Sequence, residues 1–164
     1  NKPPGPRARG RGGNRVRNKG ALIWPGLLLL ALDRISKWAW KTADQVLIPG
    51  VIALRGAQNT GMALGLFQGG APVILALSLL ALAGCFWLLR RARLSGLAPW
   101  GVSLLAGGAL GNIIDRVLYG AVTDMFELLF IRFYIFNVAD VGVVAGAILC
   151  GISLLFRPQD WSKR

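Results

Sequence analysis

Two long runs of uncharged, mostly apolar residues constrain the fold of this chain more than any other feature. Residues 71–89 form a run of 19 and residues 94–114 a run of 21. A helix of about 20 apolar residues crosses the hydrocarbon core of a bilayer, which is about 30 Å thick. A third run of 16 uncharged residues, 141–156, follows Asp140. With 54% hydrophobic residues, the chain is too apolar for a water-soluble domain of 164 residues.

These runs predict an all-α membrane protein with a small β part and four transmembrane helices. The first span is the least apolar, because Asp33, Arg34 and Lys37 interrupt it. Long basic side chains near a helix end reach the interface. The basic flank also resembles a cleavable secretory signal, but no small-residue cleavage site follows Leu32, so we expect a retained helix. The four expected spans cover residues 21–40, 71–89, 94–114 and 138–156.

The basic residues are unevenly distributed. Thirteen of the 19 Lys and Arg lie in residues 1–20, 90–93 and 157–164, which contain one acid, Asp160. In a four-helix path these segments share one side, and the other side has six basic and six acidic residues. This positive-inside pattern predicts that both termini are cytoplasmic. The net charge of +12 therefore indicates attraction to anionic lipid, with no nucleic-acid partner expected.

The expected organisation is one membrane domain, residues 21–156, between a disordered basic tail (1–20) and a cytoplasmic tail (157–164). The tail 1–20 is rich in Gly, Pro and Arg, a composition typical of disorder. Two segments, about 42–70 and 117–137, would connect the spans on the extracytoplasmic side. In the first, residues 46–48 and 51–54 around Pro49-Gly50 predict two short strands. In the second, the apolar residues 125–133 predict a helix lying in the membrane interface.

Acidic residues gather where the expected spans end on the extracytoplasmic side. A carboxylate at membrane depth costs about 2.5–3.5 kcal/mol, so its default interpretation is functional. Asp33 and Lys37 are four residues apart on one helix face, which predicts an ion pair. We also expect Arg116 to hold its neighbour Asp115 ionised.

Asp124 and Asp140 have no nearby cation by sequence spacing. The chain contains no His, so acid–base chemistry falls to carboxylates, hydroxyls, amides or cations. Two carboxylates brought together share a proton, because like charges raise one pKa. One then activates a water as general base while the other, protonated, donates to a carbonyl oxygen. A pair of this kind predicts peptide hydrolysis without a covalent intermediate.

Five motifs in the same order resemble those of lipoprotein signal peptidase (signal peptidase II), a family of bacterial aspartyl membrane proteases. The resemblance covers about residues 21–156 and leaves only the tails outside. Each motif alone is short, but five in register on a four-helix hydropathy pattern are a specific signal. They are Asp33-x-x-Ser36-Lys37, Asn59-Thr60-Gly61-x-Ala63-x-Gly65, Gly107-Gly108-Ala109-x-Gly111-Asn112-x-x-Asp115-Arg116, Val122-x-Asp124 and Phe136-Asn137-x-Ala139-Asp140.

The resemblance implies an aspartic endopeptidase with Asp124 and Asp140 as the catalytic pair. The residues themselves leave open whether Asp115 or Asp124 pairs with Asp140; we assign Asp115 a supporting role because Arg116 is adjacent. The other residues expected to bind substrate or support the site are Asp33, Lys37, Asn59, Gly61, Asn112, Asp115, Arg116, Asn137 and Ala139. Segment 42–70 would resemble the family's β-structured cradle, and its glycine-rich part would close over substrate.

The resemblance also implies the partners and location. The substrates would be prolipoproteins, cut just before a diacylglyceryl-modified cysteine. The enzyme would be a multi-pass protein of the bacterial inner membrane, in contact with membrane lipids, with its active site on the extracytoplasmic side. Apart from the resemblance, we expect a monomer. No cofactor or metal is expected. Cys85 and Cys150 lie inside apolar spans without paired spacing, so we expect them to be packing residues.

Other membrane proteins must account for the same acids. An aspartyl protease of the prepilin or presenilin kind would show a Gly-x-Gly-Asp element, and this chain has none. A rhomboid-like Ser-His enzyme is excluded by the absent His. A Ser-Lys dyad from Ser36 and Lys37 is disfavoured because neighbours on a helix point apart. A proton-coupled transporter would place acids near the midplane and show repeated halves, which this sequence lacks.

Overall fold

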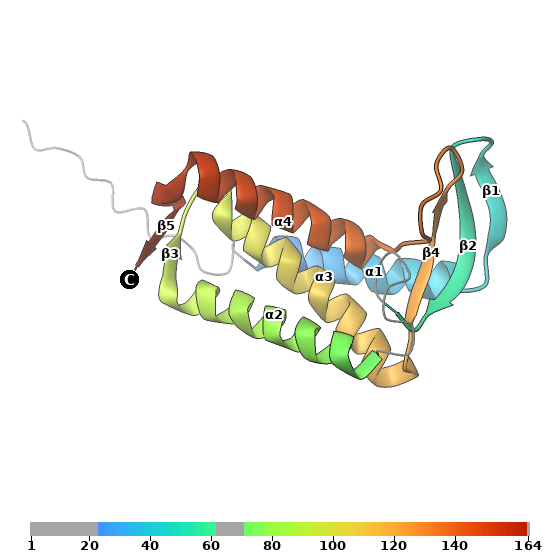
Figure 1. The fold of residues 1–164 in the computed structure, drawn as a ribbon, viewed down its shortest axis with the longest axis horizontal. Helices are drawn as coiled ribbons and strands as arrows, with labels where there is room; N and C mark the ends of the chain where they lie inside the picture. Colours follow the sequence, from blue (N-terminus) through green and yellow to red (C-terminus); the bar gives the residue numbers. More distant parts are fainter. Residues whose placement is uncertain (1–22, 62–70, 164) are drawn as a thin grey trace, which may run out of the picture.

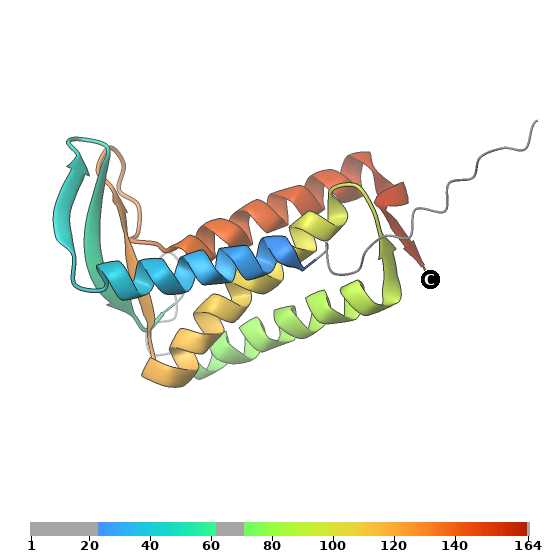
Figure 2. The ribbon, with the colours of Figure 1, turned by 180° about the vertical axis from the view of Figure 1, so that it is seen from behind.

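The computed structural model describes residues 23–61 and 71–163, so the predicted disordered tail, residues 1–20, lies outside it. The described chain forms a helical bundle with a small antiparallel sheet at each end (Figures 1 and 2). The mostly helical fold with a small β part confirms that prediction from the sequence. The helices are α1 (Trp24–Trp40), α2 (Ala71–Arg91), α3 (Ala98–Tyr119) and α4 (Val138–Phe156).

Helix α3 lies at the centre of the bundle, where it contacts each of the other three helices. Small residues make this close packing possible. A Cβ atom on Gly107 would collide with the backbone of Gly26 in α1, and one on Gly108 would collide with the carbonyl oxygen of Ala139 in α4. Membrane helices pack through such small faces because lipid gives no hydrophobic driving force between them. The glycines of α3 therefore bring α1 and α4 within backbone contact of it.

Three helices in the described part of the chain are long and apolar enough to cross a membrane. They span Pro72–Arg90, Ala98–Tyr119 and Val138–Phe156. Helix α1 forms inside the predicted range 21–40 but has only 17 residues and contains buried charged side chains. That α1 crosses the membrane stays a prediction.

Helix α3 lies later in the chain than the predicted span 94–114. It starts after Gly96, whose φ of +54° is incompatible with a continuing helix, and it ends at Gly120, whose φ is +71°. Residues Asp115 and Arg116 therefore lie inside the last turns of α3, where successive side chains point in different directions.

A three-stranded antiparallel sheet covers the end of the bundle where α4 begins. Its strands, in the order β1-β2-β4, are β1 (Asp44–Ile48), β2 (Ile52–Asn59) and β4 (Val122–Leu128). The predicted hairpin is confirmed, although both strands are longer than expected. Gly50 has a φ of +72° in the connecting turn, a conformation that glycine adopts without strain.

The predicted interfacial helix at residues 125–133 is wrong. Its first half belongs to β4, which pairs with β2 so that Leu54 lies opposite Phe126 and Ala57 opposite Asp124. The next residues form turns before α4. Pairing with β2 satisfies the backbone polar groups of this segment, and Met125 is fully buried. Packing on the bundle thus accounts for Met125, whereas Phe130 (62%) and Ile131 (48%), beyond the strand, are exposed.

The opposite end of the bundle holds a second, two-stranded sheet. Strand β3 (Ala92–Leu94) pairs with β5 (Trp161–Lys163), which follows a short 3₁₀ helix, η3 (Pro158–Asp160). Most of the segment predicted as a plain C-terminal tail is therefore folded back onto the loop between α2 and α3.

Asp160 anchors this fold-back. The residue is 2% exposed, and its side chain accepts hydrogen bonds from the backbone N–H of Leu97 (3.2 Å) and the hydroxyls of Ser95 (3.1 Å) and Ser153 (3.2 Å). Burial raises the pKa of Asp160, but these donors outweigh burial and leave the pKa below its usual value. The ionised carboxylate thus joins three chain segments.

Replacing Asp160 with alanine is expected to release the β3–β5 sheet. Hydrogen exchange should show amide exchange in residues 161–163 faster by about tenfold or more, because their opening no longer breaks these hydrogen bonds. Gln159→Ala, at an exposed neighbouring side chain, is the control. Equal exchange in the two variants would show that Asp160 does not anchor the strand.

Candidate active site

Asp140 is positioned by the N-terminal cap of α4. The side-chain oxygen of Asn137 accepts from the Asp140 backbone N–H (2.9 Å), and the Asp140 carboxylate accepts from the Asn137 backbone N–H (3.2 Å). This reciprocal capping box satisfies two N–H groups that the helix leaves unpaired. It explains the spacing of three between the two residues and places a carboxylate at the positive end of the helix dipole.

Asp124 comes from strand β4 and is held by two asparagines. The amide of Asn59, at the end of the neighbouring strand β2, donates to its Oδ2 (2.9 Å). The amide of Asn137 donates to its Oδ1 (2.6 Å). The Asp124 side chain is buried, with the residue only 2% exposed. Sheet pairing and the α4 cap thus fix both oxygens of one carboxylate.

Asn112 of α3 completes a net that joins the two acids. Its amide donates to Asp140 Oδ1 (2.7 Å), and its Oδ1 accepts from the Asn137 amide (3.1 Å). Each carboxylate oxygen of Asp124 and Asp140 therefore accepts a hydrogen bond from a backbone or side-chain N–H. Such a net holds both acids in one orientation without neutralising either.

The pKa of Asp124 is raised to about 6 from an ordinary value of 3.8. Burial is the largest cause, and the nearby charge of Asp140 adds to it, while the donors Asn59 and Asn137 oppose both effects. A carboxyl group with a pKa near neutrality exchanges its proton readily at physiological pH, which is the property required of a general acid or base.

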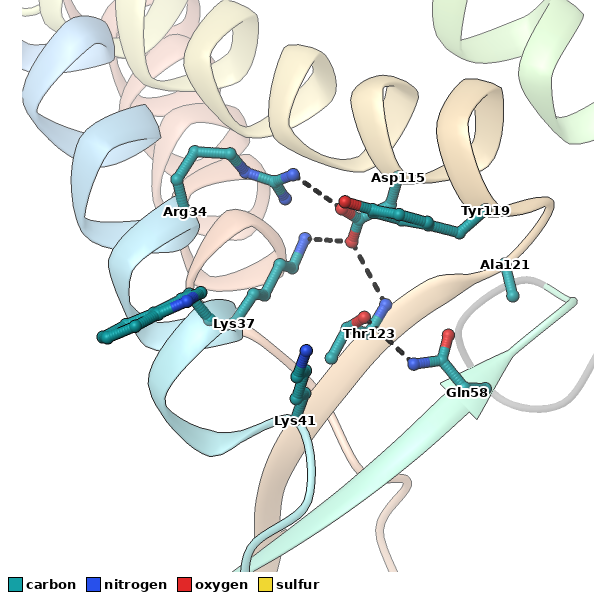
Figure 3. Close-up of a pocket in the computed structure, with 9 residues that line it drawn as sticks. Arg34, Lys37, Lys41, Gln58, Asp115, Tyr119, Ala121 and Thr123 are labelled. Carbon is teal, nitrogen blue, oxygen red and sulfur yellow. Dashed lines mark hydrogen bonds and ion pairs between the residues drawn. The ribbon is translucent and has the colours of Figure 1, made fainter.

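A second cluster, of two acids and two cations, lies beside this net. Figure 3 shows three of its members, Arg34, Lys37 and Asp115. Asp115 contacts Arg34 Nη1 (2.6 Å) and Lys37 Nζ (2.9 Å), and Asp33 contacts Arg34 Nη2 (2.7 Å) and Lys37 Nζ (3.0 Å). The Asp33–Lys37 pair confirms the prediction from their spacing. Lys37 also donates to Asn112 Oδ1 (3.0 Å), which connects the cluster to the two acids.

Two hollows open next to Asp124 and Asp140. An apolar groove of about 420 Å³ runs from Asp140 along one face of α4, past Val144 to Ile148. A smaller, more polar pocket of about 270 Å³ contains Asp124, with Asn59 and Gly61 in its lining. Asn59, Tyr134 and Ile135 line both hollows. The paired acids thus face a site that is polar on one side and apolar on the other.

Comparisons with known proteins agree with this geometry. A family profile described as signal peptidase (SPase) II matches residues 26–156. The lipoprotein signal peptidase of Solibacter usitatus is 36% identical over 147 residues, covering 80% of this chain and 88% of that one. That of Thermosynechococcus vestitus is 38% identical over 146 residues, covering 83% and 91%. The chain belongs to the signal peptidase II family. It is therefore an aspartic-type hydrolase.

The fold of this signal peptidase II chain is also similar to a solved structure. A bacterial membrane enzyme determined by the in meso method at 2.3 Å resolution superposes with a TM-score of 0.76 at 29% identity. The match covers 83% of this chain and 88% of that one. The fold is thus shared, over most of the chain, with a solved membrane enzyme.

One predicted contact of this signal peptidase II chain is wrong. Arg116 does not hold Asp115, because adjacent residues of a helix point apart. Its guanidinium donates instead to the carbonyl oxygen of Gly61 (3.2 Å), and the Gly61 N–H donates to Asn59 Oδ1 (2.9 Å). Arg116 therefore holds the start of the glycine-rich segment, whose remainder, from residue 62, lies outside the described residues.

Sequence reasoning missed two partners of the acids. Arg34 pairs with Asp33 and Asp115, and the backbone N–H of Thr123 donates to Asp115 Oδ2 (3.1 Å). Arg34 lies three residues before Lys37 and therefore shares a helix face with it. This spacing in the sequence could have identified Arg34 as a second cation of the cluster. The predicted residue Ala139 acts through its backbone, whose N–H donates to Asp33 Oδ1 (3.0 Å).

The described residues offer no metal-binding group. Within residues 23–61 and 71–163, no cluster of three or more His, Cys, Asp or Glu side chains is arranged to hold an ion. The acids of the site are instead held by amides and cations of the chain.

Replacing Arg34 with methionine is expected to destabilise the folded protein by about 3 kcal/mol, because Asp33 and Asp115 then share one cation. Thermal unfolding in detergent measures the loss. The control is Arg55→Met, which removes the exposed pairs with Asp44 and Glu127 and should cost about 1 kcal/mol or less. Equal losses would contradict a special role for the buried cluster.

Proposed function

We propose that this protein removes the signal peptide of bacterial prolipoproteins by cutting before a diacylglyceryl-modified cysteine, with Asp124 and Asp140 as the catalytic pair. The observation that supports this most directly is the Asn137 bridge, which places two acids together at the mouth of an apolar groove. The relatives from S. usitatus and T. vestitus have the name of that activity.

In the proposed mechanism the pair holds one proton between its two carboxyl groups. The ionised member takes a proton from a water molecule as the water oxygen attacks the carbonyl carbon. The protonated member donates its proton to the carbonyl oxygen. The tetrahedral intermediate then breaks its C–N bond. The leaving amine takes a proton from the pair, and one hydroxyl of the intermediate returns a proton to the pair as the carboxyl product forms. The pKa of Asp124, raised to about 6, supports a shared proton near neutral pH.

Asp124 is a better partner for Asp140 than Asp115 is. Asp115 Oδ1 is engaged by Arg34, and its Oδ2 by Lys37 and the Thr123 N–H. Two cations keep such a carboxylate ionised, so it is unsuited to exchanging a proton. Asp124 has only amide donors and shares one of them, Asn137, with the cap of Asp140. Asp115 therefore supports the site by holding α1 against α3.

The two hollows match a substrate that is both lipid and peptide. Acyl chains would lie in the apolar groove along α4, where each buried CH₂ contributes about 0.8 kcal/mol. The peptide backbone would lie in the polar pocket, beside Asn59 and Gly61. Because the hollows share Tyr134 and Ile135 in their lining, the cleaved bond would lie where they meet.

The same proposal places the protein in the bacterial inner membrane with four spans. Helix α1 exposes large apolar side chains, among them Leu28 (61%) and Ile35 (62%), which supports contact with lipid. The described chain enters α1 and leaves α4 away from the three-stranded sheet (Figure 1). Residues 90–93 lie at the same end as the C-terminus, so the basic segments support a cytoplasmic position for that end. The sheet and the two acids would then face the extracytoplasmic side.

Cleavage of a diacylglyceryl-modified prolipoprotein in detergent tests the catalytic pair. Asp124→Asn and Asp140→Asn are each expected to lower the rate by about 10³-fold or more, because each removes a proton-transfer group. Asp44→Asn, an exposed carboxylate of β1, is the control and should leave the rate unchanged. Activity kept in Asp124→Asn but lost in a folded Asp115→Asn variant would move the pair to Asp115.

The pH dependence of stability tests the environment of Asp124 without an activity assay. Folded Asp124 binds its proton more tightly than the unfolded chain does, so its contribution to stability is present below pH 3.8 and is lost as pH rises through about 6. Asp124→Asn removes this loss. The difference in free energy of unfolding between the variant and the parent should therefore shift in favour of the variant by on the order of 2 kcal/mol between pH 4 and pH 8.

Asp160→Asn gives the comparison of opposite sign. The pKa of Asp160 is lowered, so its stabilisation is present above its ordinary pKa and is lost in acid. Asp160→Asn should therefore lower the free energy of unfolding, relative to the parent, more at pH 8 than at pH 4. Both differences are measured by thermal unfolding of the two variants and the parent at pH 4 and pH 8. A pH-independent difference for Asp124→Asn would contradict the raised pKa.

A further inference from the structure

A third cavity, separate from the two hollows at the paired acids, lies between the ends of α1 and α3 and the sheet (Figure 3). Its volume is about 590 Å³, and its lining includes neither Asp124 nor Asp140. Three of its lining side chains are cations, Arg34, Lys37 and Lys41, and one is an acid, Asp115. The mechanism proposed above makes no use of this space.

The charges around this cavity do not balance. Arg34 and Lys37 are both engaged by Asp33 and Asp115, so these four charges cancel. Lys41 remains. No ion pair or hydrogen bond joins its ammonium to another residue of the lining (Figure 3). The cavity therefore holds an excess of one positive charge.

Neutral donors accompany the cations. The Thr123 hydroxyl accepts a hydrogen bond from the Gln58 amide (3.1 Å), so its own proton is available to a further acceptor. The Tyr119 hydroxyl also belongs to the lining. An anion with several acceptor oxygens would find an ammonium and hydroxyl donors on neighbouring walls.

Two exposed aromatic residues indicate the depth of the cavity relative to a membrane. Trp38 (79% exposed) and Tyr119 (68% exposed) both line it. Trp and Tyr are enriched where membrane proteins meet the lipid headgroups, and Lys side chains reach the same level. The cavity also lies where the apolar helices end and the sheet begins (Figure 1). In the membrane orientation proposed above, its mouth would therefore lie at the height of lipid headgroups.

We propose that this cavity binds the phosphate of an anionic phospholipid headgroup, with Lys41 as its main counter-charge. A phosphodiester has one negative charge and matches the excess of one positive charge. A zwitterionic headgroup adds an ammonium, which the excess positive charge of the lining would repel. A compact ammonium on a flexible stem binds phosphate as a point charge and needs no fixed fork geometry. Free inorganic phosphate has the same chemistry and is the alternative source.

Native mass spectrometry of the purified full-length protein in mixed micelles tests the proposal. Micelles contain phosphatidylglycerol in one arm and phosphatidylcholine in another, and a third arm contains inorganic phosphate alone. The parent should retain phosphatidylglycerol over phosphatidylcholine. Lys41→Gln should weaken that retention about fivefold, and Lys41→Glu should abolish the preference. Lys41 is exposed, so both variants keep the fold, which thermal unfolding verifies.

Arg132→Gln is the matched control, because Arg132 is an exposed cation at the same end of the molecule but outside the cavity lining. It should retain phosphatidylglycerol like the parent. Stabilisation by inorganic phosphate that depends on Lys41, without a preference between the lipids, would support the phosphate site and assign it to the free anion. Equal retention of phosphatidylglycerol by the parent and Lys41→Glu, or equal losses in Lys41→Gln and Arg132→Gln, would overturn the proposal.

Discussion

The buried ammonium of Lys37 is the interaction on which the rest of the site depends. The residue is 5% exposed, and its Nζ lies 2.9–3.0 Å from oxygens of Asp33, Asp115 and Asn112. A charge at this depth is tolerated only with partners on every side, so α1 and α3 must keep their relative position. Because Asn112 Oδ1 faces Lys37, its amide nitrogen faces Asp140. The orientation of Asn112, one of the donors to a proposed catalytic acid, thus follows from an ammonium on another helix.

The two proposed catalytic acids come from elements of different kind, a strand and a helix cap. Asp124 is fixed by the register of β4 on β2, and Asp140 by the first turn of α4. Neither position depends on a flexible loop, which suits a site that must hold proton-transfer groups in one geometry. The apolar groove follows α4 directly from its cap, so the element that positions Asp140 also forms a wall for an acyl chain.

Local patterns in the sequence predicted what local physics determines. Runs of apolar residues indicated the helices, Pro49-Gly50 indicated the hairpin, and a spacing of four indicated the Asp33–Lys37 pair. The failures involve partners distant in the chain. Strand β4 was taken for a helix because its partner β2 lies far earlier, with Asn59 and Asp124 separated by 65 residues.

The same limit explains the charged partners that were missed. Asp115 was assigned to its neighbour Arg116, while its true partner Arg34 lies 81 residues away on another helix. Helix faces can be inferred from periodicity, but which faces meet depends on packing at the glycines of α3. The folded C-terminal strand was missed for a similar reason, because the donors to Asp160 come from two other segments, the loop before α3 and helix α4.

Asn137 shows how a local cap becomes restricted by its surroundings. Ser, Thr, Asp and Asn all serve as helix caps, because each offers an oxygen to the backbone. At this position the oxygen accepts from the Asp140 N–H, and both amide hydrogens are also used, on Asp124 (2.6 Å) and Asn112 (3.1 Å). Aspartate has no hydrogen to give at neutral pH, and serine or threonine has one. Of these four residues, asparagine alone has both the acceptor oxygen and the two donor hydrogens that this position uses.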